Sequence, residues 1–277
     1  MSNFGLNGRL GNQMFQFAAL YAAAKKLNTS FFLYQRSSLS ASNYTAIDEF
    51  LQFDIENLGG CIWIRDAQEY QDMYQKEINT CISEPHFHYI KNFHNLPDQT
   101  DLSGYFQTEK YFKNHKDDIS EIFSIRKPTK SFLNYKQLLE NKHISLHIRR
   151  GDYVPKSDFH TNLAESDYYK DAISIMASTH PDAKYLVFSD DIEFCRSYFQ
   201  EKSRSGIEFK YVTGTTSAEE IVLQSLCIGN VIANSSFSWW GAWLNSNNGT
   251  VIAPKNWFGP NGPKDVQDLF CEKWITL

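Results

Sequence analysis

The sequence predicts an α/β fold built on parallel β-sheet, and three observations carry that prediction. In the second half of the chain, short apolar runs alternate with stretches of helical periodicity, which is typical of parallel strands covered by helices on both faces. The 277 residues suffice for two modest domains or one large one. With 42% hydrophobic and 15% aromatic residues and a formal charge of -5, the chain can fill such cores and does not resemble a disordered protein.

The first half opens with a glycine loop that leads into a helical pattern. Residues 7–12 (NGRLGN) precede apolar residues at helical spacing, and FFLYQ (31–35) then predicts a strand. The segment 37–101 is polar and aromatic with short apolar pieces, so we expect irregular structure near a ligand there. GYFQTEKYF (104–112) predicts the end of a strand followed by a helix, with Thr108 as N-cap.

The second half follows IRKPTK (125–130), which is the best linker candidate. We place two domains at residues 1–135 and 136–277, with the last residues free to pack back on the first domain. The predicted strands are ISLHI (144–148), KYLVFS (184–189), FKYVTG (209–214), NVIAN (230–234) and TVIAP (250–254). The predicted helices run from about Asp167 to Ser178, after Asp191, and from near Ser217.

The stretch SLHIRRGDYV (145–154) places polar side chains where a predicted strand ends. His147 and Arg149 share one side of an extended chain, and ligands of parallel sheets bind beyond the carboxyl ends of strands. A guanidinium group offers a fork of donors that matches phosphate oxygens. The alternative is an ion pair between an arginine and Asp152 that fixes the turn. Both interpretations stay open at this point.

The stretch NSSFSWWGAW (234–243) begins a predicted helix directly after a strand. Free N–H groups and serine hydroxyls at a helix start can hold a phosphate, helped by the helix dipole. The alternative is an ordinary serine cap, with the tryptophans packed in the core.

Two acidic motifs stand before predicted helices. In FSDD (188–191) one carboxylate could accept the paired N–H donors of a guanine edge, whereas Asp190 and Glu193 have the spacing of a helix cap. Ser217 and Glu220 have the spacing of a capping box.

The glycine loop carries three polar side chains, Arg9, Asn12 and Gln13, at a helix start. Its glycines allow backbone to approach a ligand closely, or alternatively form a tight structural turn. The spacing of a dinucleotide fingerprint is missing.

The charge balance indicates which classes of partner the protein can bind, and the cysteine content indicates its cellular compartment. Because 27 Lys and Arg stand against 32 Asp and Glu, nothing indicates a nucleic-acid partner. Five scattered cysteines without a C-x-x-C pair favour a reducing compartment, so we expect a cytoplasmic protein. No apolar window reaches the roughly 18 residues of a membrane span, while attachment to a membrane surface stays open.

The sequence gives little support for a metal site, a serine-hydrolase nucleophile or a nucleotide-binding Walker loop. His86, His88 and His94 lack the carboxylate or cysteine spacing of a metal site, and we expect no metal and no cofactor. The chain contains neither a G-x-S-x-G elbow nor a Walker loop.

Taken together, five motifs resemble the bacterial alpha-1,2-fucosyltransferases of glycosyltransferase family eleven. They follow in order through nearly the whole chain and are GRLGNQMFQFA (8–18), GYFQTEKYF (104–112), HIRRGDY (147–153), FSDD (188–191) and NSSFSWWGAWLN (234–245). The resemblance implies a GT-B-like fold of two Rossmann-type domains facing a cleft. The first would be the acceptor side and the second the GDP-fucose-binding domain. The one departure is the short segment SNFGL before the glycine loop, where the family has a longer strand.

The resemblance also implies an activity: inverting, metal-independent transfer of L-fucose from GDP-fucose to the 2-hydroxyl of a terminal galactoside. The acceptor would be a galactose-terminated oligosaccharide or lipid-linked glycan, as in lipopolysaccharide O-antigen, reached from the cytoplasm or the inner membrane face. Two alternatives stay open: a fucosyltransferase of another linkage, and a non-catalytic protein that binds a nucleotide-sugar or carbohydrate.

Carried over by motif, the resemblance assigns Arg149 to the donor diphosphate, His147 to the ribose or phosphate, and Asp152 to orienting these groups or the sugar. The other implied donor-binding residues are Arg9, Asn12, Gln13, Asp190, Asp191, Ser235, Ser236, Phe237 and Ser238. A carboxylate base for the acceptor hydroxyl would be Asp152, Asp158 or Glu165.

Overall fold

The computed structural model describes residues 1–3, 8–34, 47–55, 58–64, 66–85, 87–139, 143–204 and 206–277. These residues form two compact units: Met1–Arg126 with Asp265–Cys271 (unit 1), and Lys127–Lys264 with Glu272–Leu277 (unit 2). Most of the predicted first strand and His86 lie outside the described residues.

Unit 1 is built on a parallel five-stranded sheet of order β3-β2-β1-β5-β4. Its strands are β1 (Ser2–Asn3), β2 (Phe31–Tyr34), β3 (Cys61–Ile64), β4 (Thr80–Ser83) and β5 (Thr100–Ser103). Its helices are α1 (Leu10–Leu27), α2 (Ile47–Phe50), α3 (Ala67–Glu77) and α4 (Lys116–Ile122), with 3₁₀ turns η1 (Phe93–Asn95), η2 (Glu109–Tyr111) and η3 (Lys113–His115). The predicted long helix and the strand after it are confirmed as α1 and β2.

The segment Asp265–Cys271 belongs to unit 1, although the last residues, Glu272–Leu277, belong to unit 2. The Asp268 carboxylate accepts a hydrogen bond from the Tyr89 N–H at 2.8 Å and pairs with Lys110. These contacts join residues 179 and 158 positions apart, so no local pattern could predict them.

Unit 2 contains the predicted alternating strands and helices. Its parallel strands are β6 (His143–Ile148), β7 (Lys184–Ser189), β8 (Phe209–Tyr211), β9 (Gly229–Val231), β10 (Val251–Ala253) and β11 (Ile275–Thr276). The order β8-β7-β6-β9-β10-β11 is the 3-2-1-4-5-6 order of a dinucleotide-binding sheet when counted from β6. The strand order reverses between β6 and β9, which is where such sheets bind ligands.

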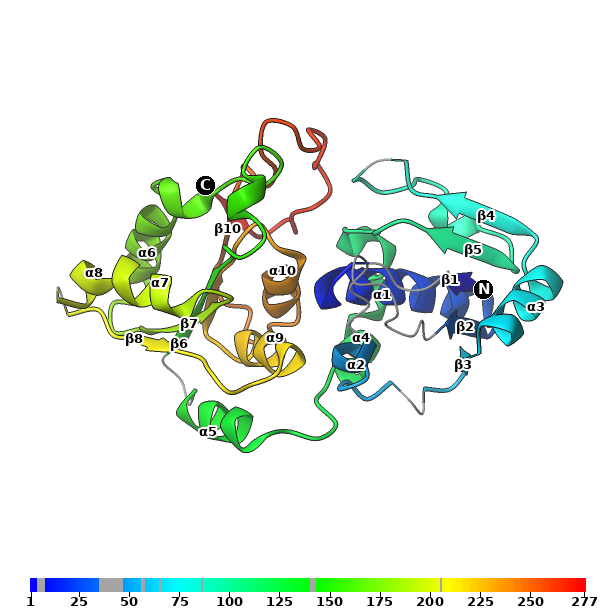
Figure 1. Ribbon diagram of the computed structural model, residues 1–277, viewed down its shortest axis with the longest axis horizontal. Helices are drawn as coiled ribbons and strands as arrows, with labels where there is room; N and C mark the ends of the chain where they lie inside the picture. The colour runs from blue at the N-terminus through cyan, green and yellow to red at the C-terminus, as the bar shows by residue number, and fades with distance from the viewer. Residues whose placement is uncertain are drawn as a thin grey trace. The chain divides into compact units, whose positions relative to one another are not determined.

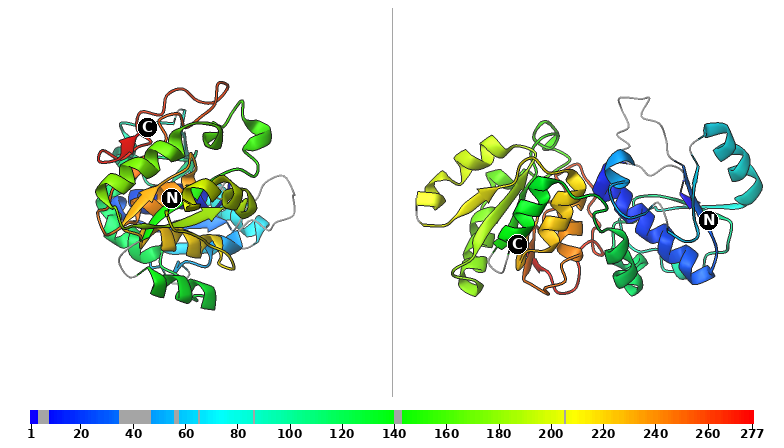
Figure 2. Two further views of the ribbon diagram at one scale, coloured as in Figure 1. Left: turned by 90° about the vertical axis from the view of Figure 1, so that its left-hand side faces the viewer. Right: turned by 90° about the horizontal axis from the view of Figure 1, so that it is seen from below.

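Helices cover both faces of the unit 2 sheet. They are α5 (Lys130–Leu138), α6 (Tyr168–Thr179), α7 (Ile192–Tyr198), α8 (Gln200–Arg204), α9 (Ser217–Ser225) and α10 (Ser236–Trp243), with 3₁₀ turns η4 (Val154–Lys156) and η5 (Leu163–Glu165). Figure 1 shows α6 and α7 on one face and α9 and α10 on the other, and Figure 2 gives two further views of these layers.

Strand β6 shows why the sheet needs both layers. Ile144, Leu146 and Ile148 are fully buried in the core that contains Tyr169 of α6. The alternate residue His147 contacts Phe237 of α10 instead, at 5.2 Å between ring centroids. All six residues of β6 are therefore buried, the apolar ones on one face of the sheet and His143, Ser145 and His147 on the other.

Two predicted helix caps are wrong by one residue. The N-cap of α7 is Asp191, whose carboxylate accepts from the Phe194 N–H at 3.1 Å, so Asp190 is not the cap. The capping box of α9 is formed by Thr216 and Glu219, not by Ser217 and Glu220. An N-cap requires a non-helical backbone, and Thr216 adopts it with φ -89° and ψ 162°.

The predicted boundary at residues 135 and 136 falls inside α5, whereas the two units divide between Arg126 and Lys127. Thr129 caps α5, and its hydroxyl donates to the Glu219 carboxylate of α9 at 2.9 Å. Because this bond ties the start of α5 to unit 2, the division lies within the predicted linker 125–130.

Candidate functional site

The carboxyl ends of β6 and β7 hold Arg149 between two carboxylates. Its Nη1 lies 2.8 Å from Asp190 Oδ2, and its Nη2 pairs with Asp152. A Cβ on Gly151 would lie 2.4 Å from Asp190 Oδ2, so any larger residue there would displace the Asp190 carboxylate. The predicted ion pair with Asp152 is present, and it fixes the direction of the guanidinium group at the edge where ligands of such sheets bind.

Arg150 takes a different direction from Arg149. Its Nε lies 3.3 Å from Asp191 Oδ2, and its guanidinium carbon lies 3.5 Å from the ring centroid of Phe194 in α7. The two arginines therefore do not form a joint anion clamp. Arg149 is the guanidinium group that remains beside His147.

His147 is buried, with 4% of its surface exposed, and its Nδ1 has no hydrogen-bond partner among the described residues. Burial, and secondly the Arg149 charge, lower the pKa of His147 to about 3. The ring is therefore neutral at pH 7 and offers a hydrogen bond rather than a positive charge.

The start of α10 divides the predicted serine cluster into two kinds of residue. Ser235 is the N-cap, and Ser238 bonds the Ala233 N–H at 3.1 Å through its fully buried hydroxyl, which closes the turn from β9 into α10. Ser236 and Phe237 are half-buried at the first turn. The predicted serine cap and the buried position of the tryptophans are confirmed, and Ser238 has a structural role.

The loop after Arg149 contains an aromatic pair that the sequence analysis missed. The rings of Tyr153 and His160 are parallel within 4°, with centroids 3.8 Å apart. The Tyr153 hydroxyl donates to the Asn234 carbonyl at 3.2 Å, beyond the end of β9. The residues are seven apart in an irregular loop, so only their aromatic character, not their spacing, could have drawn attention to them.

The three carboxylates predicted as bases differ in their surroundings. Asp152 pairs with Arg149, whereas Asp158 and Glu165 are exposed. Glu165 accepts a hydrogen bond from Asn162 Nδ2 at 2.8 Å. The structure therefore brings only Asp152 into the cluster at the end of β6.

In unit 1 the glycine loop is held by its own polar side chains. Gly8 has φ +75°, and a Cβ there would lie 2.5 Å from Asn12 Nδ2. Arg9 is exposed and occupies the N-cap position of α1. Gln13 Nε2 donates to the Gly8 carbonyl at 3.1 Å, while its fully buried Oε1 has no partner among the described residues.

A loop after β5 supports this glycine loop. Gln107 Nε2 donates to Asn12 Oδ1 at 2.8 Å, at the point where the strand order of unit 1 reverses between β1 and β5. Glu84 fixes the same loop by accepting from the N–H groups of Tyr105 and Phe106 at 2.9 and 2.8 Å. Burial raises the pKa of Glu84 to about 6. Sequence analysis missed Glu84 and Gln107 because their roles depend on the fold.

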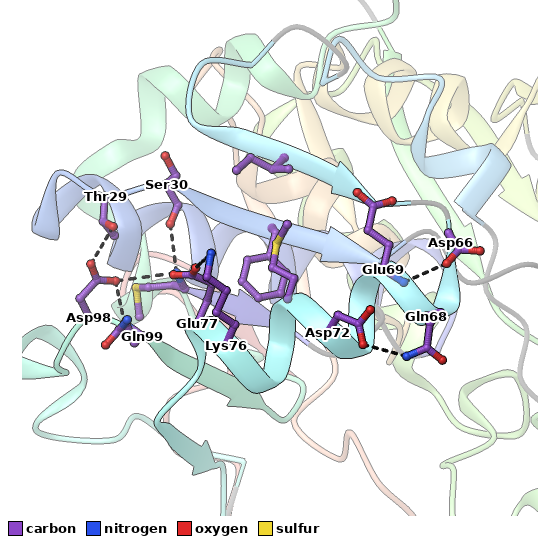
Figure 3. Close-up of a pocket in the computed structure, with 14 residues that line it drawn as sticks. Thr29, Ser30, Asp66, Gln68, Glu69, Asp72, Lys76, Glu77, Asp98 and Gln99 are labelled. Atoms are coloured by element: carbon purple, nitrogen blue, oxygen red, sulfur yellow. Dashed lines mark hydrogen bonds and ion pairs between the residues drawn. The ribbon is translucent and has the colours of Figure 1, made fainter.

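Unit 1 also contains a cavity of about 820 Å³ along α3. Figure 3 shows its acidic lining, in which Asp72 accepts from Gln68 and Asp98 from Thr29. Thr29 and Asp98 precede β2 and β5, so this part of the cavity is at the amino ends of the strands. An acidic lining disfavours a diphosphate, and none of the predicted site residues lines this cavity.

Within the described ranges, no group of three or more His, Cys, Asp or Glu side chains could hold a metal ion. No helix of the described chain combines the length and apolar character needed to cross a membrane.

Comparison with known proteins decides the family. The family model described as "Glycosyl transferase family 11" matches residues 1–277. The chain belongs to this family. It is 33% identical to the alpha-1,2-colitosyltransferase of Escherichia coli, over 98% of this chain and 97% of that protein. It is 30% identical to the O-antigen biosynthesis glycosyltransferase WbnK of Escherichia coli, over 98% and 99% of the two chains.

More distant similarities extend to an animal protein in sequence and to a plant protein in fold. The chain is 24% identical to the galactoside 2-alpha-L-fucosyltransferase Sec1 of Mus musculus, over 100% of this chain and 74% of that protein. Among solved structures, a variant of Arabidopsis thaliana FUT1 in complex with GDP matches with a TM-score of 0.54 at 12% identity, over 92% of this chain and 71% of that one. This likeness supports the α/β fold.

Proposed function

We propose that the protein transfers L-fucose from GDP-fucose to the 2-hydroxyl of a terminal galactoside, with inversion at the anomeric carbon. One observation carries the proposal: Arg149 and His147 lie at the carboxyl end of β6, where the 3-2-1-4-5-6 order reverses beside β9. Family membership and the name of the Mus musculus relative support the sugar and the linkage.

The departing GDP needs its growing negative charge neutralised. Arg149 would bind the diphosphate, since two carboxylates already fix its orientation and a guanidinium group has five N–H donors. The first turn of α10, with Ser235, Ser236 and Phe237, would supply further donors and the positive end of the helix dipole. The proposed reaction needs no metal, because these fixed groups supply the electrostatic stabilisation.

The remaining assignments concern the nucleoside and the residues of unit 1. Neutral His147 would bind the ribose or a phosphate oxygen. Both Asp190 and Asp191 pair with an arginine, but the Asp191 side chain is 41% exposed against 26% for Asp190, which makes Asp191 the more accessible carboxylate for guanine. The proposal includes a GT-B-like arrangement, in which Arg9, Asn12 and Gln13 of unit 1 complete the donor site.

A second donor is favoured by the relative at 33% identity, the alpha-1,2-colitosyltransferase. Colitose is fucose without its 3-hydroxyl group. A site that hydrogen-bonds this hydroxyl rejects the analogue that lacks it by a large factor, so the two donors can be separated by kcat/KM.

The acceptor belongs to the same proposal. Because WbnK is named for O-antigen biosynthesis, we infer a galactose-terminated glycan, free or lipid-linked, as acceptor. We propose that the protein is cytoplasmic and reaches a lipid-linked acceptor by peripheral attachment to the inner face of the membrane.

Incubation of purified protein with lactose and either GDP-fucose or GDP-colitose, while GDP release is followed, tests this function. We expect release with GDP-fucose, unchanged in EDTA, and an alpha-1,2 linkage in the product by NMR. Turnover of GDP-colitose but not of GDP-fucose would show that colitose is the sugar transferred. A product with another linkage would show that the 2-hydroxyl is not the acceptor position. Tight GDP binding by calorimetry without any turnover would favour a non-catalytic binding protein.

A further inference from the structure

His160 lies in the loop between β6 and α6, close to the proposed donor site. Its ring stacks on Tyr153 at 3.8 Å between centroids. The guanidinium carbon of Arg149 lies 5.3 Å from the centroid of the same Tyr153 ring. Tyr153 therefore contacts both the imidazole and the arginine to which we assign the donor diphosphate.

Backbone contacts hold the His160 loop in place. His160 forms an antiparallel bridge with Phe258, and the Gly259 N–H donates to the Phe159 carbonyl at 2.8 Å. A Cβ on Gly259 would lie 2.6 Å from the Ser157 carbonyl oxygen, so the two loops approach as closely as glycine allows. The imidazole is thus positioned before any substrate binds, as a group that transfers protons must be.

The charges around His160 suit a proton acceptor. Burial lowers the pKa of His160, Lys156 and Arg149 lower it further, and Asp152 opposes them by raising it. The ring is therefore neutral at pH 7, and the Asp152 carboxylate would stabilise the imidazolium that forms when the ring takes a proton. The apolar faces of Tyr153 and Phe258 complete its surroundings.

Building on the proposed function, we propose that His160 is the general base that accepts the proton of the acceptor hydroxyl. The acceptor oxygen forms its bond to the anomeric carbon while the bond from that carbon to the β-phosphate oxygen breaks. The electron pair of the broken bond leaves with GDP, and the proton moves to a ring nitrogen of His160. His160 then takes the role of base in place of the exposed Asp158 and Glu165. The Asp152 carboxylate stabilises the protonated form of His160.

Two variants of the full-length protein separate the base from the ring stack. His160→Phe keeps an aromatic ring on Tyr153 but has no nitrogen, whereas His160→Ala leaves room for added imidazole. We expect both to lower kcat with lactose about a hundredfold or more, with the affinity for GDP within about twofold of wild type. Added imidazole should restore His160→Ala but not His160→Phe. His180→Phe, at the C-cap of α6, is the matched control and should keep wild-type kcat.

The pH dependence of kcat gives a second test, because a purely structural role of His160 would not change it. Since the base must be unprotonated, wild-type kcat should fall as the pH drops through the His160 pKa, and both variants should lack this limb. A His160→Phe protein with near wild-type kcat and an intact acidic limb overturns the proposal while the transferase function stands. So does a loss of GDP affinity that matches the loss of kcat. A wild-type protein that transfers nothing from either GDP-sugar to any galactoside overturns the function and this role together.

Discussion

At the residue scale, the candidate site depends on the orientation of one guanidinium group, that of Arg149, rather than on the number of positively charged side chains. Arg149 and Arg150 stand against Asp152, Asp190 and Asp191, so the cluster carries no excess of positive charge before the donor binds. Long-range attraction of an anion is therefore weak, and in the proposed reaction the directed N–H donors of Arg149 would supply the interaction with the leaving diphosphate.

Arg149→Ala should therefore lower kcat about a hundredfold, which corresponds to about 3 kcal/mol of transition-state stabilisation. Arg149→Lys should recover only part of it, because an ammonium group lacks the planar fork. The control is Arg196→Ala, which removes a half-exposed arginine of α7 and should leave kcat unchanged. Steady-state kinetics with GDP-fucose and lactose measure these changes in kcat. A wild-type kcat in Arg149→Ala would contradict the assignment of Arg149 to the donor diphosphate.

Glu84 gives a residue-scale prediction for stability in unit 1. Burial raises its pKa to about 6 in the folded protein, above the ordinary value of 4.5. The folded state therefore holds this proton more tightly than the unfolded state, and the contribution of Glu84 to stability falls as the pH rises from about 4.5 to 6. The difference amounts to about 2 kcal/mol, from 1.4 kcal/mol per pKa unit.

Glu84→Gln should lack this pH-dependent component, whereas Glu77→Gln, whose side chain is 43% exposed, should keep it. Urea denaturation at pH 4.5, 5.5 and 6.5 measures the difference between each variant and wild type. Parallel stability curves for Glu84→Gln and wild type would show that the carboxyl is not buried as described.

At the element scale, the strands were predictable and the exact caps were not. The apolar run of KYLVFS predicts β7, and the alternating Ile144, Leu146 and Ile148 of ISLHI predict β6, so both strands could be read from the sequence directly. The caps at Asp191 and Thr216 depend on which residue leaves the helical backbone, and neighbouring residues of the same type compete for that position. The stack of Tyr153 on His160 and the bond from Gln107 to Asn12 join segments placed by the fold, so no local pattern contains them.

The turn from β9 into α10 yields a prediction at this scale. Ser238→Ala would leave the buried Ala233 N–H without its hydroxyl partner, which costs about 1–3 kcal/mol. We expect a lower midpoint of thermal unfolding for Ser238→Ala than for Ser236→Ala, since Ser236 is only half-buried. Calorimetry of the two variants checks this, and equal midpoints would assign Ser238 a role other than closing the turn.

At the scale of the whole molecule, two places compete as the nucleotide site: the edge of the unit 2 sheet and the cavity along α3. The chemistry favours the first, since the cavity is lined by Asp66, Glu69 and Asp72, whereas the sheet edge offers Arg149 and the start of α10. A ligand that binds only the folded state at a hundred times its Kd stabilises it by about 2.7 kcal/mol, and protection from exchange is greatest near the site.

Hydrogen–deuterium exchange with saturating GDP should therefore slow in residues 147–153 and 234–238 and stay unchanged in 66–77, which form the α3 side of the cavity. Arg149→Ala should abolish the protection at the same GDP concentration, while Arg196→Ala should retain it. Protection confined to 66–77 would move the nucleotide to unit 1. It would also show that the reversal of strand order in unit 2 does not mark the donor site, because the same GDP would then be held against carboxylates rather than against a guanidinium group.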